Sequence, residues 1–124
     1  MADAIAQQQS VKRARFFYAV ECPYENEMIG SVGHTLRGSD AADCGWFLLP
    51  AYWGKGHAVQ AVRELLMLAF GAGGITRMTA WCSVENQASV RVAEKCGFRL
   101  TSQIQSRACF EIRTEEFHCL EKYD

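Results

Sequence analysis

The chain has 124 residues, of which 49% are hydrophobic, and this is enough apolar material for the core of a single domain, residues 1–124. Its formal net charge of −1 argues against a protein that binds nucleic acid through a basic surface. Its apolar runs are too short to span a membrane, and residues 1–15 lack the apolar core of a signal peptide.

The six cysteines contain no C-x-x-C pair. Without a secretory signal, we interpret them as reduced and mostly buried thiols of a cytoplasmic protein. Close ligand pairs of the kind that bind zinc are also missing, so we expect no metal site.

Aromatic and β-branched residues favour strands in the first part of the chain. Residues 15–20 and residues 28–36 have this composition and flank a turn at residues 23–27, which predicts an antiparallel hairpin. Gly30 and Gly33 weaken the second strand and are typical of a bulge. Before the hairpin, the Ala- and Gln-rich residues 2–9 favour a short helix or a frayed end.

A third strand and the clearest helix follow. Residues 43–49, which contain the apolar run 45–49, are predicted to be the third strand, and the strand ends at Pro50, which cannot donate a hydrogen bond to a sheet. Residues 59–70 are predicted to be a helix that the glycines of residues 71–74 terminate. Its predicted buried face consists of residues at helical spacing, namely Ala58, Ala61, Val62, Leu65, Leu66 and Ala69.

The second half of the chain predicts a strand, a helix and two further strands. After a strand at residues 77–82, Asn86 is a good cap for a helix to Cys96, and Gly97 is favourable just past its end. Strands follow at residues 98–103 and near 108–114, whereas 115–124 show no clear pattern. Strands joined by a crossover helix should be parallel neighbours, so we expect a mixed, twisted α/β sheet with helices packed on it.

A glycine-rich turn, Trp53-Gly54-Lys55-Gly56-His57-Ala58, joins the third strand to the first helix. This arrangement suits a phosphate, because the first N–H groups of a helix have no internal partner and glycines let the backbone approach an anion closely. The turn matches neither the dinucleotide pattern G-x-G-x-x-G nor the Walker pattern. Taken alone, it is equally consistent with an ordinary strand-to-helix turn.

A second segment supports the phosphate interpretation: Asn86-Gln87-Ala88-Ser89, followed by Glu94-Lys95-Cys96-Gly97-Phe98. The turn resembles the Q/R-x-x-G-x-G/A loop of the Gcn5-related N-acetyltransferases (GNAT), with Trp53 at the Q/R position. The second segment resembles the N-x-x-S…E-K-x-G-F pattern of their RimJ/RimL-like branch. The resemblance covers about residues 15–100. It implies a GNAT-like acyl-CoA N-acyltransferase fold and transfer of an acetyl group from acetyl-CoA to a primary amine, either a protein N-terminus or a small amine.

The resemblance also implies where acetyl-CoA binds. Its pyrophosphate would lie against the N–H groups of the turn, and its pantetheine arm beside the third strand, which splays from the next strand in this family. The tryptophans Trp46, Trp53 and Trp81 lie near this cleft, and core packing accounts for them, although Trp53 is also placed to cover the CoA site. The expected cofactor-binding residues are Phe47, Leu48, Leu49, Trp53, Gly54, Lys55, Gly56, His57, Ala58, Asn86 and Ser89.

The candidate catalytic residues are Asp43, Ser89 and Glu111. Many relatives place a tyrosine seven residues after the asparagine to protonate the leaving thiolate. Here that position is Ala93, so Ser89 is the candidate acid, unless the thiolate leaves without one. A base must take a proton from the amine, and Asp43 occupies a position where relatives often have an acidic residue, with Glu111 and His34 as alternatives.

The family normally begins with a strand and two helices before the hairpin. Few residues precede it here, so we expect the first strand and helix to be absent and residues 2–9 to be a remnant of the second helix. The acceptor wall would then be incomplete, which leaves a non-catalytic CoA-binding or interaction module as the alternative function. An uncovered sheet edge favours a homodimer, which could also complete the wall, with Phe16, Phe17 and Tyr18 near the contact.

Overall fold

The computed structural model describes residues 15–22, 27–71 and 74–122, with the backbone alone for residues 119–122. The helix expected at residues 2–9 and most of the turn expected at residues 23–27 lie outside this part of the chain. The described strands are β1 (Arg15–Cys22), β2 (Glu27–Leu36), β3 (Ala41–Leu48), β4 (Arg77–Ser83), β5 (Arg99–Ile104) and β6 (Arg107–Arg113). The helices are α1 (His57–Gly71), α2 (Gln87–Lys95) and α3 (Thr114–Lys122), with a 3-10 turn at Pro50–Tyr52.

The strands form one mixed sheet in the order β1-β2-β3-β4-β6-β5. β1 and β2 pair antiparallel, and β3 and β4, which are joined through α1, pair parallel, as the sequence predicted. The expectation that strands joined by a crossover helix are neighbours in the sheet is wrong for β4 and β5. They are joined through α2 and run in the same direction, but β6 lies between them and pairs antiparallel with both. A crossover connection fixes the direction of the strand that follows it, but a third strand can still take the neighbouring place.

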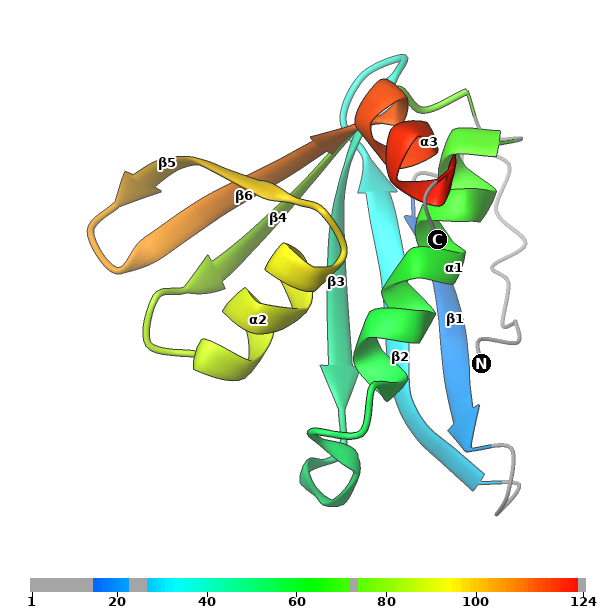
Figure 1. Ribbon diagram of the computed structural model, residues 1–124, viewed down its shortest axis with the longest axis vertical. Helices are drawn as coiled ribbons and strands as arrows, with labels where there is room; N and C mark the ends of the chain where they lie inside the picture. The colour runs from blue at the N-terminus through cyan, green and yellow to red at the C-terminus, as the bar shows by residue number, and fades with distance from the viewer. Residues whose placement is uncertain (1–14, 23–26, 72–73, 123–124) are drawn as a thin grey trace.

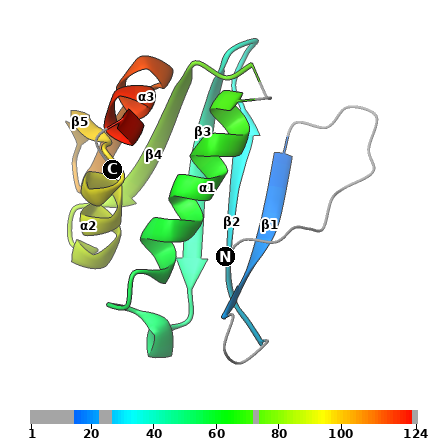
Figure 2. The ribbon, with the colours of Figure 1, turned by 45° about the vertical axis from the view of Figure 1, so that its right-hand side comes forward.

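All three helices lie over the same face of the sheet (Figures 1 and 2). The predicted apolar stripe of α1 is buried against that face at Ala61, Val62, Leu65, Leu66 and Ala69, while Ala58 is only half-buried. α3 was not recognised in the sequence, where residues 115–124 showed no pattern. It buries Phe117, whose ring packs 5.5 Å from that of Phe70 on α1.

The predicted irregularity in the first hairpin is present. The β1–β2 register shifts between Val20 and Glu21, beside Gly30. A Cβ on Gly30 would lie 2.1 Å from the carbonyl oxygen of Phe47, and one on Gly33 would lie 2.5 Å from that of Phe16. Both glycines therefore allow a neighbouring strand to approach more closely than a side chain would permit.

β3 and β4 separate part-way along their length. Their parallel pairing runs from Ala41 and Arg77 to Cys44 and Ala80, and it stops there although β3 continues to Leu48. Figure 1 shows the two strands diverging from a shared end. The far half of β3 therefore has an open edge on the side where β4 would otherwise lie.

Across the described residues, no helix covers the opposite face of the sheet. The strand alternation places Phe17, Asp43, Thr79, Trp81 and Glu111 there, and Phe17 and Trp81 are 43% and 39% exposed. Arginines stack on both rings, with Arg15 5.8 Å from the ring of Phe17 and Arg107 5.7 Å from that of Trp81.

Within the described part of the chain, no helix is both long and apolar enough to cross a bilayer. Five cysteines are described with their side chains, and all are free thiols: Cys22, Cys44, Cys82, Cys96 and Cys109. Burial raises the pKa of Cys96 to about 12, and it also raises the pKa of Cys44. Both thiols are therefore protonated and packed as small apolar groups.

Candidate active site

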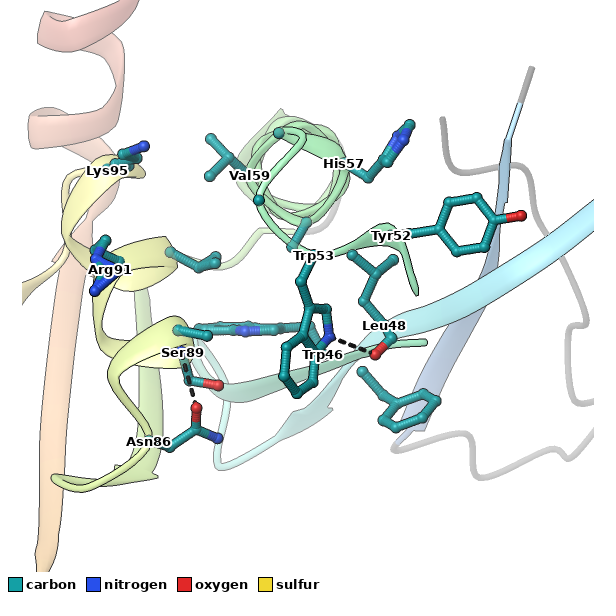
Figure 3. Close-up of a pocket in the computed structure, with 16 residues that line it drawn as sticks. Trp46, Leu48, Tyr52, Trp53, His57, Val59, Asn86, Ser89, Arg91 and Lys95 are labelled. Carbon is teal, nitrogen blue, oxygen red and sulfur yellow. Dashed lines mark hydrogen bonds between the residues drawn. The ribbon is translucent and has the colours of Figure 1, made fainter. Parts of the chain in front are cut away.

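A pocket of about 250 Å³ lies between the open half of β3, the turn that opens α1, and α2. Figure 3 shows side chains from these three elements converging on it. The lining residues are Trp46, Phe47, Leu48, Tyr52, Trp53, Gly54, Gly56, His57, Ala58, Val59, Asn86, Ala88, Ser89, Arg91, Val92 and Lys95.

The two glycines of the turn adopt a backbone conformation that other residues rarely take. Gly54 has φ 78° and Gly56 has φ 86°, both in the left-handed region. None of the described residues has an atom within 4 Å of a Cβ built on either glycine, so packing within this part of the chain does not require them. Gly56 immediately precedes α1, where its carbonyl oxygen accepts a hydrogen bond from the N–H of Gln60 at 3.1 Å. Having no side chain, Gly56 cannot cap the first N–H groups of α1, which stay available to a ligand.

The start of α2 is built differently. The side-chain oxygen of Asn86 accepts a hydrogen bond from the N–H of Ser89 at 3.1 Å, which confirms Asn86 as the predicted cap. Cys96 is the C-cap residue, and Gly97 follows it at φ 97°. Both Asn86 and Ser89 line the pocket as well, so the capping role leaves the Asn86 amide nitrogen and the Ser89 hydroxyl near its interior.

The open edge of β3 presents backbone groups to the pocket. The N–H of Leu49 donates to the carbonyl of Ile29 on β2, and successive residues of a strand direct their backbone groups to opposite sides. The groups of Leu48 and Trp46 therefore point away from β2, toward the side that β4 has left. Nε1–H of Trp53 donates to the carbonyl of Leu48 at 2.8 Å, which accounts for one of these groups. The rest can bond amides of an extended ligand.

Three residues of the pocket wall have nitrogen-containing basic side chains: His57 comes from the start of α1, and Arg91 and Lys95 come from α2. The described residues that line the pocket include no aspartate or glutamate. Lys55, predicted to bind phosphate, does not line the pocket; its Nζ lies 5.8 Å from the ring centre of Tyr52. The electrostatics favour an anionic ligand.

Most of the predicted cofactor-binding residues meet in this pocket, and Leu49 and Lys55 lie outside its lining. Arg91 and Lys95 were not among the predicted binding residues, although helical spacing from Ala88 places them on one side of α2. Trp46 was predicted to lie near the cleft as a core residue, and it lines the pocket wall. Trp81, expected near the cleft, lies on the opposite face, and its exposure together with that of Trp53 (54%) shows that core packing does not account for them.

The predicted catalytic residues divide between the two faces of the sheet. Ser89 is in the pocket, whereas Asp43 and Glu111 lie on the helix-free face, in one row with Thr79 between them. Thr79 donates its hydroxyl to Asp43. Arg37 pairs with Asp43 at 2.6 Å, and Arg113 pairs with Glu111 at 3.1 Å.

His34, the third candidate base, is in the core. It is 7% exposed, and its ring stacks on that of Phe16 at 5.0 Å. Its Nδ1 has no hydrogen-bond partner among the described residues, and burial lowers its pKa. A ring enclosed in this way cannot reach an acceptor amine, so its assignment as a base was wrong.

Comparison with known families gives this geometry a context. Residues 1–99 match the model of the acetyltransferase (GNAT) domain. The chain belongs to this family. It is 30% identical over 84 residues to the uncharacterized N-acetyltransferase YoaA of Bacillus subtilis, a match that covers 66% of this chain and 48% of YoaA. It is 32% identical over 95 residues to the probable N-acetyltransferase YjcK of the same organism, covering 74% and 52%. The chain thus spans about half the length of the curated relatives that it matches.

Solved structures show the same fold. A GNAT-family acetyltransferase from Bacillus anthracis superposes with a TM-score of 0.74 at 28% identity, covering 81% of this chain and 67% of that one. The spermidine N-acetyltransferase from Vibrio cholerae, solved in complex with CoA and spermine, gives 0.78 at 20% identity, covering 87% and 70%. At that identity the second likeness concerns the fold alone. The mixed sheet with flanking helices is therefore the GNAT fold that the sequence predicted.

Proposed function

We propose that this chain binds acetyl-CoA in the pocket and transfers the acetyl group directly to a primary amine. The observation that carries the proposal is the glycine turn beside the open edge of β3. Gly54 and Gly56 have positive φ, and none of the described residues occupies the space where their side chains would stand. The part of β3 that leads to this turn, from Cys44 to Leu48, no longer pairs with β4. A long ligand with phosphates at one end and amides at the other matches both features.

The residues present fit the chemical groups of CoA. The N–H groups of residues 54–58 would hold the pyrophosphate, and His57, Arg91 and Lys95 would balance its charge. Trp46 and Leu48 would bond the amides of the arm through their backbone groups. When bound, acetyl-CoA supplies an acetyl group activated as a thioester, and backbone N–H groups of the open edge can polarise its carbonyl.

The positions of the candidate acid and bases support direct transfer. Ser89 lines the pocket on the helix-covered side, and Asp43 lies on the other face, one residue before the pairing of β3 and β4 ends. In our proposal the amine approaches from the helix-free face, and the carboxylate of Asp43 or Glu111 takes its proton. Ser89 donates a proton to the departing sulfur, if any donor is needed.

The proposal also covers the class of acceptor and the cellular compartment in which the reaction takes place. Similarity of the two sequence motifs to the RimJ/RimL-like branch favours a protein N-terminus or a small amine. The free thiols of the described cysteines are the form that a reducing compartment maintains, and we place the reaction in the cytoplasm.

We also propose that two copies associate through β1. This strand forms one edge of the described sheet, and edge strands tend to be paired or covered. Of the three aromatics predicted at the contact, Phe17 is exposed on the helix-free face, Tyr18 is half-buried, and Phe16 packs on His34 instead. A two-fold contact centred on Phe17 would bury both the edge and this ring.

An assay of free-thiol release tests the activity. Acetyl-CoA is supplied with a panel of amines that includes polyamines, amino acids and peptides with a free N-terminus, and acetylated products are identified by mass spectrometry. We expect thiol release above the rate of hydrolysis with at least one class of amine. Asp43→Asn should lower kcat/KM for that amine by about tenfold or more. Leu68→Ala, a change at an exposed position of α1 that neither lines the pocket nor lies on the helix-free face, should leave it unchanged.

Two results would contradict the proposal in different ways. A chain that binds CoA but releases no thiol with any amine is the non-catalytic CoA-binding module. If the chain binds no CoA, it is neither an acetyltransferase nor a CoA-binding module.

A further inference from the structure

Trp53 has an arrangement that the fold itself does not require. Its indole is 54% exposed and lines the pocket, so it is not held by core packing. Its Nε1–H nevertheless fixes it by a 2.8 Å hydrogen bond to the carbonyl of Leu48. Figure 3 shows the ring extending from the turn toward β3, with this bond drawn. A large apolar ring that is held by a hydrogen bond but exposed inside a pocket suggests a ligand that covers it.

The partner of this hydrogen bond determines where the ring stands. Leu48 is the last residue of β3, and its carbonyl points to the open edge. The bond therefore places the indole of Trp53 beside the path between the glycine turn and the point where β3 leaves β4. An extended ligand that follows the open edge from the turn must pass this ring.

Trp46 contributes a second aromatic surface to the same pocket. It comes from β3, is half-buried, and packs against Phe98 with ring centres 6.4 Å apart. Figure 3 shows its indole projecting into the pocket from β3, whereas that of Trp53 comes from the turn. Trp46 is thus supported from behind by the core, while Trp53 is held by one hydrogen bond.

We propose that Trp46 and Trp53 form an aromatic clamp for the pantetheine arm of CoA. The inference rests on the proposed function, and it divides the pocket into two parts by chemistry. Backbone N–H groups and cations serve the phosphate-bearing nucleotide half of the ligand. The two indoles bury the methylenes and the sulfur-bearing end of the arm, because apolar area removed from water is the main gain that aromatic rings provide.

This division can be tested by calorimetry with two probes, CoA and 3′-phosphoadenosine 5′-diphosphate, the half of CoA that lacks the arm. Trp53→Ala should weaken CoA binding by about tenfold and leave binding of the nucleotide within about twofold of the parent. Trp53→Phe, which keeps a ring but loses the N–H, should bind CoA with an affinity between that of the parent and that of Trp53→Ala. Trp81→Ala is the matched control, because that indole is exposed on the opposite face, and it should bind both probes like the parent.

Fluorescence gives a second readout that does not depend on activity. CoA should quench the parent's tryptophan emission, and Trp53→Phe should remove a large part of that quenching. Circular dichroism and thermal melting establish that each variant is folded before its binding is compared.

Three outcomes would overturn the clamp. If folded Trp53→Ala binds CoA within twofold of the parent, the ring makes no useful contact with the arm, and the proposed function stands without it. If the variant loses the nucleotide probe as strongly as CoA, Trp53 organises the phosphate turn instead of holding the arm. If the parent binds neither probe, the proposed function fails together with the clamp.

Discussion

A comparison of Gly56 with Gly38 distinguishes a role in ligand binding from a role in folding. At φ 86° any side chain is strained, and Gly38, in the loop between β2 and β3, has the same property at φ 106°. In the part of the chain that the structure describes, no atom lies within 4 Å of the place that a Cβ would take on either glycine, but Gly56 lines the pocket and Gly38 does not. Valine at either position should therefore cost similar stability, whereas only one should affect a ligand.

We expect Gly56→Val to weaken CoA binding at least tenfold, which corresponds to about 1.4 kcal/mol, as measured by calorimetry. Gly38→Val is the control for backbone strain and should bind CoA like the parent. A folded Gly56→Val variant with the parent's affinity would show that the turn does not hold the pyrophosphate.

His34 should make the stability of the fold depend on pH. Its pKa is lowered by burial from the ordinary value of 6.5, and its ring faces Phe16 on β1 and Cys44 on β3, neither of which is charged. Below pH 6.5 the unfolded chain binds a proton at His34 that the folded chain resists binding. The free energy of unfolding should therefore fall as the pH drops below 6.5, until the lowered pKa of the folded state is reached.

Urea denaturation at pH 7.5 and at pH 5.5 measures this effect, with His34→Leu as the comparison. The parent should lose more stability between the two pH values than the variant, which has no group to titrate at this position. Equal losses in the two proteins would mean that another group carries the pH dependence.

At the scale of elements, α2 combines a structural task and a binding task in one residue. The Asn86 side chain caps the helix through Ser89, and it also lines the pocket. Asn86→Ala should lower the free energy of unfolding by about 1 kcal/mol in urea denaturation. Asn86→Asp keeps the capping oxygen and should recover most of that loss.

The same pair of variants reports on the ligand. Asn86→Asp removes the amide donor and adds a negative charge, so CoA binding should remain weakened several-fold even though the cap is restored. An aspartate variant as unstable as the alanine variant would contradict the capping role, and one with the parent's affinity for CoA would contradict the contact.

The elements that sequence could predict are those with local signals. The stripe of α1, the Asn86 cap and the Pro50 stop each depend on residues near in sequence, and the structure confirms them. The place of β6 between β4 and β5 depends on which strands meet in space, and no local pattern contains it. α3 had a weak signal, since Glu115 and Glu116 lie in its first turn, where acidic residues are favourable.

The residues of the candidate site also fall into those that local sequence could predict and those that depend on the three-dimensional arrangement. The glycines of the turn were predictable because positive φ restricts the residue type. Arg91 and Lys95 needed the position of α2 relative to β3, and the bond from Trp53 to the Leu48 carbonyl needed the path of the turn. Long side chains reach across elements, and sequence spacing alone does not show what they reach.

At the scale of the whole molecule, the position of β1 at one edge of the described sheet leads us to expect association. Light scattering at micromolar concentration should give a mass of twice 13.9 kDa. Phe17→Glu should shift the protein to the monomer by placing a charge at the proposed contact. Leu68→Glu makes a similar change at another exposed apolar position, on α1, and should leave the dimer intact. A parent protein that scatters as a monomer would contradict the two-fold contact.

If the glycine turn and the open edge of β3 together bind acetyl-CoA, a crystal structure of the chain with CoA should show the ligand lying along both. We predict pyrophosphate oxygens within hydrogen-bond distance of N–H groups at residues 54–58, and the pantetheine arm along β3 at Trp46 and Leu48. CoA bound elsewhere on the molecule, with the turn and the strand edge free of it, would contradict the account.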